Sequence, residues 1–146
     1  MIRRAGLIVF MSLILLAGVV TRSQEKGGQQ ASTSGWTLPP DADAKKSPLT
    51  VNEKVLAAGK AVFKDKCTRC HGPGGLGDGP DADPDHREDM DLTNGKRADR
   101  NSDGIVFYKV WNGRRRPKMP AFKDELNEQQ VWSVVAYAQS LRKAAK

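Results

Sequence analysis

The hydrophobic and polar positions first mark out an N-terminal segment. Residues 5–20 form a run of 16 mostly apolar residues, which follows Arg3 and Arg4 and precedes the polar residues 21–23. A basic start before such a run is typical of a secretion signal. The run is slightly shorter than the ~20 residues that span a bilayer comfortably. We therefore predict that residues 1–23 are a signal peptide, with an N-terminal membrane anchor as the alternative.

Residues 24–48 show no hydrophobic period. They are rich in Gly, Gln, Ser, Pro and charged residues, which predicts a linker. Trp36 is the exception in this segment, because an exposed indole is unfavourable in water. Two interpretations are open: Trp36 packs against a folded domain, or it is exposed in a flexible tether.

Helical periodicity begins near Leu49. The segment Thr50-Val51-Asn52-Glu53 has the pattern of a capping box with Thr50 as the N-cap. We expect the helix that follows to run into Cys67. Its apolar or small positions recur at helical spacing, at Val55, Gly59, Val62 and Phe63. The stretch from Gly72 to Pro84 is rich in Gly and Pro and is predicted to be a loop.

Two further helices are predicted. Ser102 or Asp103 caps a short helix that ends at Gly113, and residues 127–130 cap a last helix. The buried stripe of the last helix is expected at Val131, Val134, Val135, Ala138 and Leu141, with Trp132 and Tyr137 flanking it. No segment has a convincing strand pattern. Residues 49–146 are therefore expected to form one all-α domain.

Charge is unevenly distributed along this domain. Residues 78–91 contain seven acidic residues and one basic residue, whereas residues 109–118 contain five basic residues and no acidic one. The formal net charge of the chain is +7. The basic stretch is short and no nucleic-acid motif accompanies it, so nucleic-acid binding is not expected.

The strongest chemical signal is Cys67-Thr68-Arg69-Cys70-His71, which contains both cysteines of the chain. C-x-x-C-H is the attachment sequence for a c-type haem. On a helical turn, Cys67 and Cys70 share a face from which both can reach one edge of a porphyrin, and His71 can bind the iron. The alternatives are a zinc site, which would need every Cys and His of the chain, a dithiol redox pair, and a disulfide.

The order of these features resembles the class I c-type cytochromes with a single haem. The match runs from Leu49 onward through C-x-x-C-H, a Gly/Pro loop, a short helix, Met119-Pro120-Ala121-Phe122 and a final helix. The resemblance implies an all-α cytochrome c fold with three or more helices around one covalent haem c. It makes Cys67 and Cys70 the thioether anchors, and His71 and Met119 the axial ligands of iron.

The resemblance also suggests further assignments. His86, Met90 or an open position are alternatives to Met119 as the distal ligand. Pro80 is the candidate whose carbonyl accepts the ring N–H of His71. Trp111 is a candidate haem contact, as are Arg97 and Arg100 for the carboxylates of the haem, with ordinary core packing or solvation as alternatives. Gly59, Phe63 and Tyr137 are expected where the first and last helices cross.

The resemblance implies one-electron transfer in the bacterial periplasm, by an electron carrier that is not itself an enzyme and is soluble or tethered. The alternatives are a haem subunit docked to an oxidase, reductase or dehydrogenase, and a haem peroxidase or gas sensor with a labile distal ligand. Membrane association is expected only if residues 1–23 are retained. A basic rim is expected to steer an acidic redox partner, and it comprises Arg114, Arg115, Arg116 and Lys118.

Overall fold

The computed structural model describes residues 35–98 and 100–142. Six α-helices and two 3-10 helices occur in this part of the chain, with isolated β-bridges in place of a sheet. They are η1 (Ala42–Ala44), α1 (Glu53–Lys66), α2 (Thr68–His71), η2 (Pro84–His86), α3 (Arg87–Met90), α4 (Gly95–Ala98), α5 (Asp103–Asn112) and α6 (Glu128–Leu141). The prediction of an all-α domain is confirmed. The signal peptide or anchor predicted at residues 1–23 lies outside the described residues.

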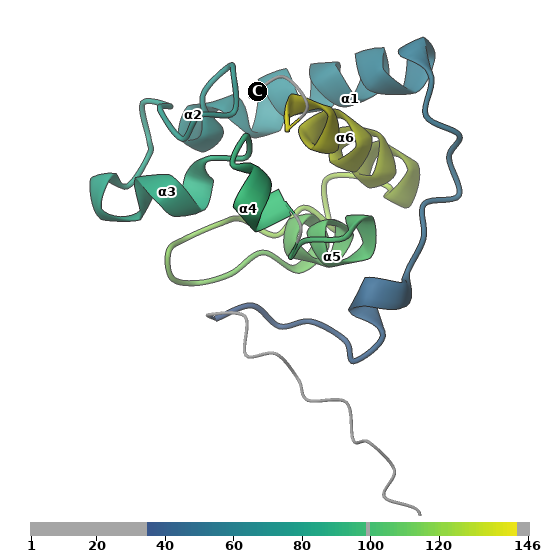
Figure 1. Cartoon of the computed structure of the whole chain (residues 1–146), viewed down its shortest axis with the longest axis horizontal. Helices are drawn as coiled ribbons and strands as arrows, with labels where there is room; N and C mark the ends of the chain where they lie inside the picture. Colours follow the sequence, from purple (N-terminus) through teal and green to yellow (C-terminus); the bar gives the residue numbers. More distant parts are fainter. Residues whose placement is uncertain (1–34, 99, 143–146) are drawn as a thin grey trace, which may run out of the picture.

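Helices α1 and α6 cross and form the largest contact between elements of the fold (Figure 1). Gly59 permits this crossing, because a Cβ placed there would lie 2.0 Å from the carbonyl oxygen of Ser133 and 2.9 Å from Cβ of Tyr137. The Tyr137 ring packs against Phe63 at a centroid distance of 5.3 Å. Gly59, Phe63 and Tyr137 therefore meet at the crossing, as predicted.

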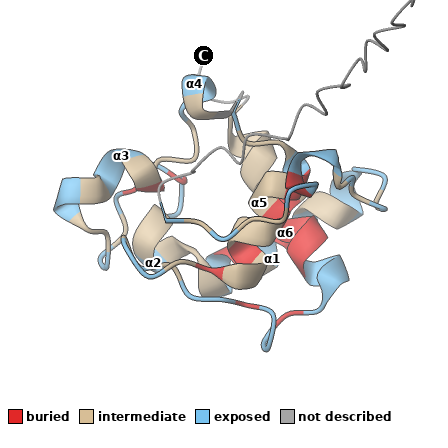
Figure 2. Ribbon diagram, turned by 90° about the horizontal axis from the view of Figure 1, so that it is seen from below, coloured by how far each residue is buried: buried red, intermediate tan, exposed pale blue. Residues whose placement is uncertain are grey.

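The core lies where α1, α5 and α6 come together, and the buried parts of the ribbon gather there (Figure 2). Trp132, which was predicted to flank the buried stripe of the last helix, itself belongs to this core with 2% of its surface exposed. The indole ring packs on Phe107 at a centroid distance of 4.4 Å. The other large buried side chains are Phe63, Phe122, Leu126, Val131, Val134 and Val135.

The helix ends follow local capping chemistry. Ser102 caps α5 and Gly113 ends it, and Asn127 forms a capping box with Gln130 at the start of α6, as predicted. The cap predicted for the first helix is wrong. Asn52, rather than Thr50, is the N-cap, and its side chain accepts a hydrogen bond from the backbone N–H of Val55 at 3.0 Å.

Residues 36–47, which we call the strap, pass beneath α5 on their way to α1 (Figure 1). Ala42 is 3% exposed, and its carbonyl oxygen would lie 2.1 Å from a Cβ on Gly104. Nζ of Lys45 lies 4.3 Å from the centroid of the Phe107 ring. The second half of the predicted linker is thus packed against the domain. Among the described helices, none is long and apolar enough to cross a membrane.

Candidate haem site

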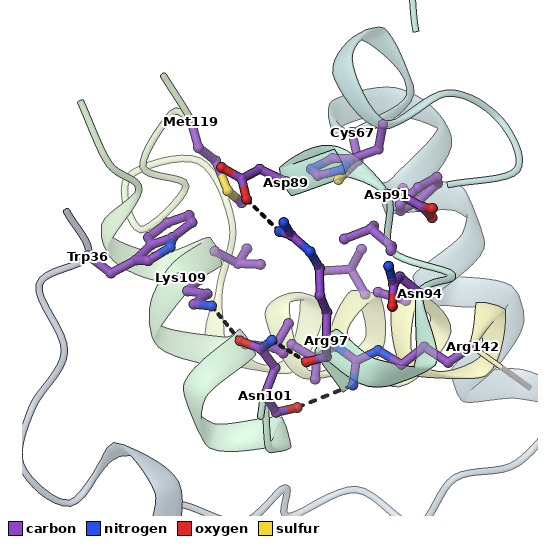
Figure 3. Close-up of a pocket in the computed structure, with 18 of the residues that line it drawn as sticks. Trp36, Cys67, Asp89, Asp91, Asn94, Arg97, Asn101, Lys109, Met119 and Arg142 are labelled. Carbon is purple, nitrogen blue, oxygen red and sulfur yellow. Dashed lines mark hydrogen bonds and ion pairs between the residues drawn. The ribbon is translucent and has the colours of Figure 1, made fainter. Parts of the chain in front are cut away.

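A cavity opens between the helices and the loops that precede α5 and α6 (Figure 3). It contains about 980 Å³ of space, part of which is open to solvent. Its apolar lining includes Phe63, Val110, Val134, Val135 and Ala138. Cys67, Met119 and His71 all line it, and Figure 3 shows Met119 at the upper left and Cys67 at the upper right of the view.

The end of α1 positions the C-x-x-C-H segment. Cys67 follows the last residue of α1, and its carbonyl oxygen accepts hydrogen bonds from the N–H groups of Cys70 at 3.3 Å and His71 at 2.9 Å. This single turn places Cys67, Cys70 and His71 together beside a smaller cavity that adjoins the first. Both thiols are free of a disulfide, and burial raises the pKa of Cys67 to about 12.

A backbone carbonyl fixes the ring of His71. Its Nδ1 lies 2.7 Å from the carbonyl oxygen of Met90. A carbonyl can only accept, so Nδ1 carries the proton and Nε2 keeps its lone pair. Burial lowers the pKa of His71, which also favours the neutral ring that binds metals. The assignment of this contact to Pro80 was wrong.

The path of the loop keeps Pro80 away from the His71 ring. Pro80 is exposed and lies between two residues that bond back to the short helix α2, since the N–H of Gly79 donates to Cys70 and that of Asp81 to Arg69. The chain returns to His71 only at the end of α3, whose last residue is Met90. A hydrogen bond of 2.7 Å from the N–H of Leu92 to the carbonyl of Gly75 fastens this return.

A tight hairpin presents Met119. The backbone N–H and C=O groups of Arg114 and Met119 pair with each other in both directions at 2.9 Å. Gly113 precedes the hairpin with φ of 61°, and a Cβ at this position would lie 2.5 Å from the carbonyl oxygen of Met119. Met119 lines both cavities, so the structure brings it to the same space as His71.

The other candidate ligands are placed differently. Met90 is 7% exposed and lines only the smaller cavity, where its carbonyl already serves His71. His86 pairs with Asp83 at 3.0 Å and lines neither cavity. No cluster of three or more His, Cys, Asp or Glu side chains suited to a metal occurs in the described part of the chain.

Basic side chains form part of the cavity lining. Arg97 pairs with Asp89, and Lys109 donates a hydrogen bond to the side chain of Asn101. Burial, followed by the charge of Arg114, lowers the pKa of Lys109 to about 8. Such a cluster is suited to the carboxylates of a ligand. The basic residues of this lining are Arg97, Lys109, Arg114 and Arg142, and its acidic residues are Asp89 and Asp91.

Some predicted contacts are not formed, and other residues were missed. Trp111 does not line the cavity and stacks on Phe107 at a centroid distance of 5.6 Å. Trp36, Lys109 and the inward orientation of Arg114 were not predicted as part of the site. The basic and aromatic character of these residues is visible in the sequence, but their meeting depends on how the strap folds back.

The comparisons with known proteins agree with this geometry. Residues 56–142 match the family model described as Cytochrome c. Since the match covers more than half of the chain, the chain belongs to the cytochrome c family. No curated protein matches the chain. The predicted class I c-type cytochrome and its all-α fold are confirmed, and haem-based electron transfer is the general function of the family.

The family implies haem c with its iron, and the residues of the cavity fit this group. The apolar part of the lining suits a macrocycle, His71 offers an unprotonated nitrogen, and the basic side chains of the lining suit two carboxylates. Cys67, Cys70 and His71 adjoin one another on one turn, which suits attachment and ligation from a single segment.

Proposed function

We propose that this chain is a one-electron carrier with one haem c joined to Cys67 and Cys70 through thioethers and bound axially by His71 and Met119. The observation that carries the proposal is that His71 and Met119 line one cavity, each held by its own backbone contacts. The bound iron would supply the chemistry, by alternating between two oxidation states that differ by one electron.

The residues of the chain orient and provide the ligands of the iron. Met90 keeps the His71 ring in one tautomer and one orientation through its carbonyl. Met119 offers a thioether, a neutral and polarisable ligand that favours the reduced state and raises the reduction potential. The apolar part of the lining would pack against the macrocycle, and ligation by both His71 and Met119 would leave no position on the iron for a substrate.

Optical spectra with matched methionine variants test this ligation. The wild-type protein is expected to show the methionine-to-iron charge-transfer band when oxidised and to bind CO slowly when reduced. Met119→Ala is expected to lose the band and to bind CO rapidly, whereas Met90→Leu keeps the wild-type behaviour. A wild type without the band, or a Met119→Ala protein that retains it, would contradict the proposed ligand.

Mass spectrometry tests the covalent attachment and the export. The basic residues before the apolar run at residues 5–20 support export, with the folded domain in the periplasm or on the outer face of the cytoplasmic membrane. The mature protein is expected to carry the mass of one haem after acid–acetone extraction. Its N-terminus, read from the same sample, tells a cleaved signal from a retained anchor.

We also propose a revised docking surface for a redox partner. Arg115, Arg116 and Lys118 are exposed at the tip of the hairpin that holds Met119. Arg114 does not belong to this surface, because its side chain is 7% exposed and pairs with Asp89 at 3.7 Å. The three exposed residues favour an acidic partner near the distal side of the site.

A further inference from the structure

Trp36, in the N-terminal strap, forms part of the cavity wall. It lines both cavities, and Figure 3 shows it on the same side as Met119 and Lys109. The centroid of its rings lies 4.4 Å from Cζ of Arg114 and 5.1 Å from Nζ of Lys109. The indole therefore offers its face to two cations whose side chains are largely shielded from water.

Arg114 connects this contact to Met119. The backbone of Arg114 pairs with that of Met119 in both directions at 2.9 Å, which closes the hairpin. Its side-chain Nε donates to the carbonyl oxygen of Pro117 at 3.0 Å, inside the same hairpin. Anything that fixes the Arg114 side chain therefore also fixes the turn from which Met119 projects.

The strap holds Trp36 in place. Nδ2 of Asn112, at the end of α5, donates to the carbonyl oxygen of Thr37 at 3.3 Å. Farther along, Ala42 is buried against Gly104 at the start of α5. These contacts join residues more than 60 positions apart in the sequence, so Trp36 is presented by packed backbone.

We propose that Trp36 is a positioning residue for the distal ligand: by stacking on Arg114 it keeps the 114–119 hairpin closed and so keeps Met119 in place. This inference rests on the proposed ligation by His71 and Met119. The contact joins Trp36 to Arg114 and involves neither cysteine, so its loss is expected to loosen the distal ligand while leaving the attachment to Cys67 and Cys70 unchanged.

Three variants of the full chain separate this role from simple packing. Trp36→Leu keeps an apolar side chain and removes the ring face, whereas Trp36→Phe keeps a ring with a weaker attraction for cations. Leu38→Ala is the control, because it removes apolar surface from the same strap at a residue that does not line the cavity. Imidazole is the probe, because it competes with Met119 for oxidised iron.

Trp36→Leu is expected to bind imidazole about three- to tenfold more tightly than the wild type and to have a weaker charge-transfer band, as loss of a shielded cation–π contact predicts. The imidazole affinity of Trp36→Phe should lie between those of the wild type and Trp36→Leu. The affinity of Leu38→Ala should match that of the wild type. In an Arg114→Leu protein, Trp36→Leu should have little further effect, because the two residues act through one contact. If Trp36→Leu loses its helical circular dichroism, the imidazole affinity of Trp36→Phe relative to the wild type tests the inference instead.

Equal imidazole affinity and equal band intensity in wild type and Trp36→Leu would overturn the inference about Trp36 alone. The same holds if Leu38→Ala changes the affinity as much as Trp36→Leu does. A wild-type protein without the charge-transfer band would instead overturn the proposed ligation and, with it, this inference. The two failures are therefore distinguishable in one set of spectra.

Discussion

At the scale of single residues, the site depends on main-chain groups as much as on side chains. His71 takes its orientation from the carbonyl of Met90, and Met119 takes its position from backbone pairing with Arg114. Substitution of the Met90 side chain leaves that carbonyl in place. The residues to test at this scale are therefore those where a side chain, or the lack of one, decides the geometry.

Gly59 is such a residue. Gly59→Ala would place a Cβ 2.0 Å from the carbonyl oxygen of Ser133, so α1 and α6 must separate. We expect a loss of about 2–3 kcal/mol in the free energy of unfolding, measured by denaturant titration. The control is Gly95→Ala, where a Cβ meets nothing within 4 Å. It should not destabilise the protein, and equal losses in both variants would contradict the role of the crossing.

Asp89 is expected to make stability depend on pH. The hydrogen bond from Arg97, the largest cause, lowers the pKa of Asp89 below its usual value of 3.8. A lowered pKa stabilises the folded state above the unfolded value, and this contribution disappears as the pH falls through the folded value. At neutral pH, Asp89→Asn should lower the free energy of unfolding by roughly 0.5–1 kcal/mol, which is the contribution of a partly exposed ion pair.

Unfolding curves at several pH values check the effect of Asp89. The difference between wild type and Asp89→Asn should be constant above about pH 5 and should shrink as the pH falls below 3.8. Arg97→Gln, which removes the partner, should show the same dependence. A difference between wild type and Asp89→Asn that does not change with pH would contradict the ion pair as its source.

At the scale of helices, the caps give a direct test of the first helix boundary. Asn127 accepts from the N–H of Gln130 at 2.9 Å, and Asn52 accepts from that of Val55 at 3.0 Å. We expect Asn127→Ala and Asn52→Ala each to cost about 1 kcal/mol in thermal or denaturant unfolding. Thr50→Ala should stay within about 0.5 kcal/mol of the wild type. A larger loss for Thr50→Ala than for Asn52→Ala would place the cap at Thr50 after all.

The ends of the helices were largely predictable from local capping residues. Ser102, Gly113 and the Asn127 capping box bound α5 and α6 where the sequence predicted, because each cap acts on residues within one turn. At the start of α1 the sequence predicted Thr50 as the cap from the capping-box pattern, whereas Asn52, two residues later, is the cap. The motif at residues 67–71 is likewise local, so the adjacency of Cys67, Cys70 and His71 on one turn followed from their spacing.

Contacts between distant segments were not predictable in this way. The acceptor for His71 is Met90, 19 residues later, and it is reached only after the acidic loop turns back through α3. The meeting of Trp36 with Arg114 needs the strap to pass under α5. In the sequence, Arg114 could not be distinguished from the exposed basic residues beside it. The geometry of the hairpin directs its side chain into the cavity.

At the scale of the whole molecule, charge is expected to control the rate of electron exchange. Oxidation by hexacyanoferrate(III), an anion, should slow by about tenfold as the ionic strength rises from 0.01 to 1 M, since the Debye length falls from about 30 to 3 Å. Replacing Arg115, Arg116 and Lys118 together by Gln should remove most of this dependence, because these residues are exposed on the hairpin that holds Met119.

The matched control removes the same charge elsewhere. Lys54, Lys60 and Lys64 are exposed on α1, and their replacement by Gln lowers the net charge equally. This control should keep most of the dependence on salt. If both triple variants respond alike, net charge rather than a docking surface governs the rate.

The close contact of α1 and α6 at Gly59 has a consequence for electron exchange itself. α1 leads directly into Cys67, and α6 contributes Val134, Val135 and Ala138 to the facing wall of the cavity. Because the two backbones touch at the crossing, the walls have little freedom to adjust when the charge between them changes by one. Dipoles that are fixed in advance need little reorganisation. The crossing should therefore keep the reorganisation energy small, which permits fast exchange at a modest driving force.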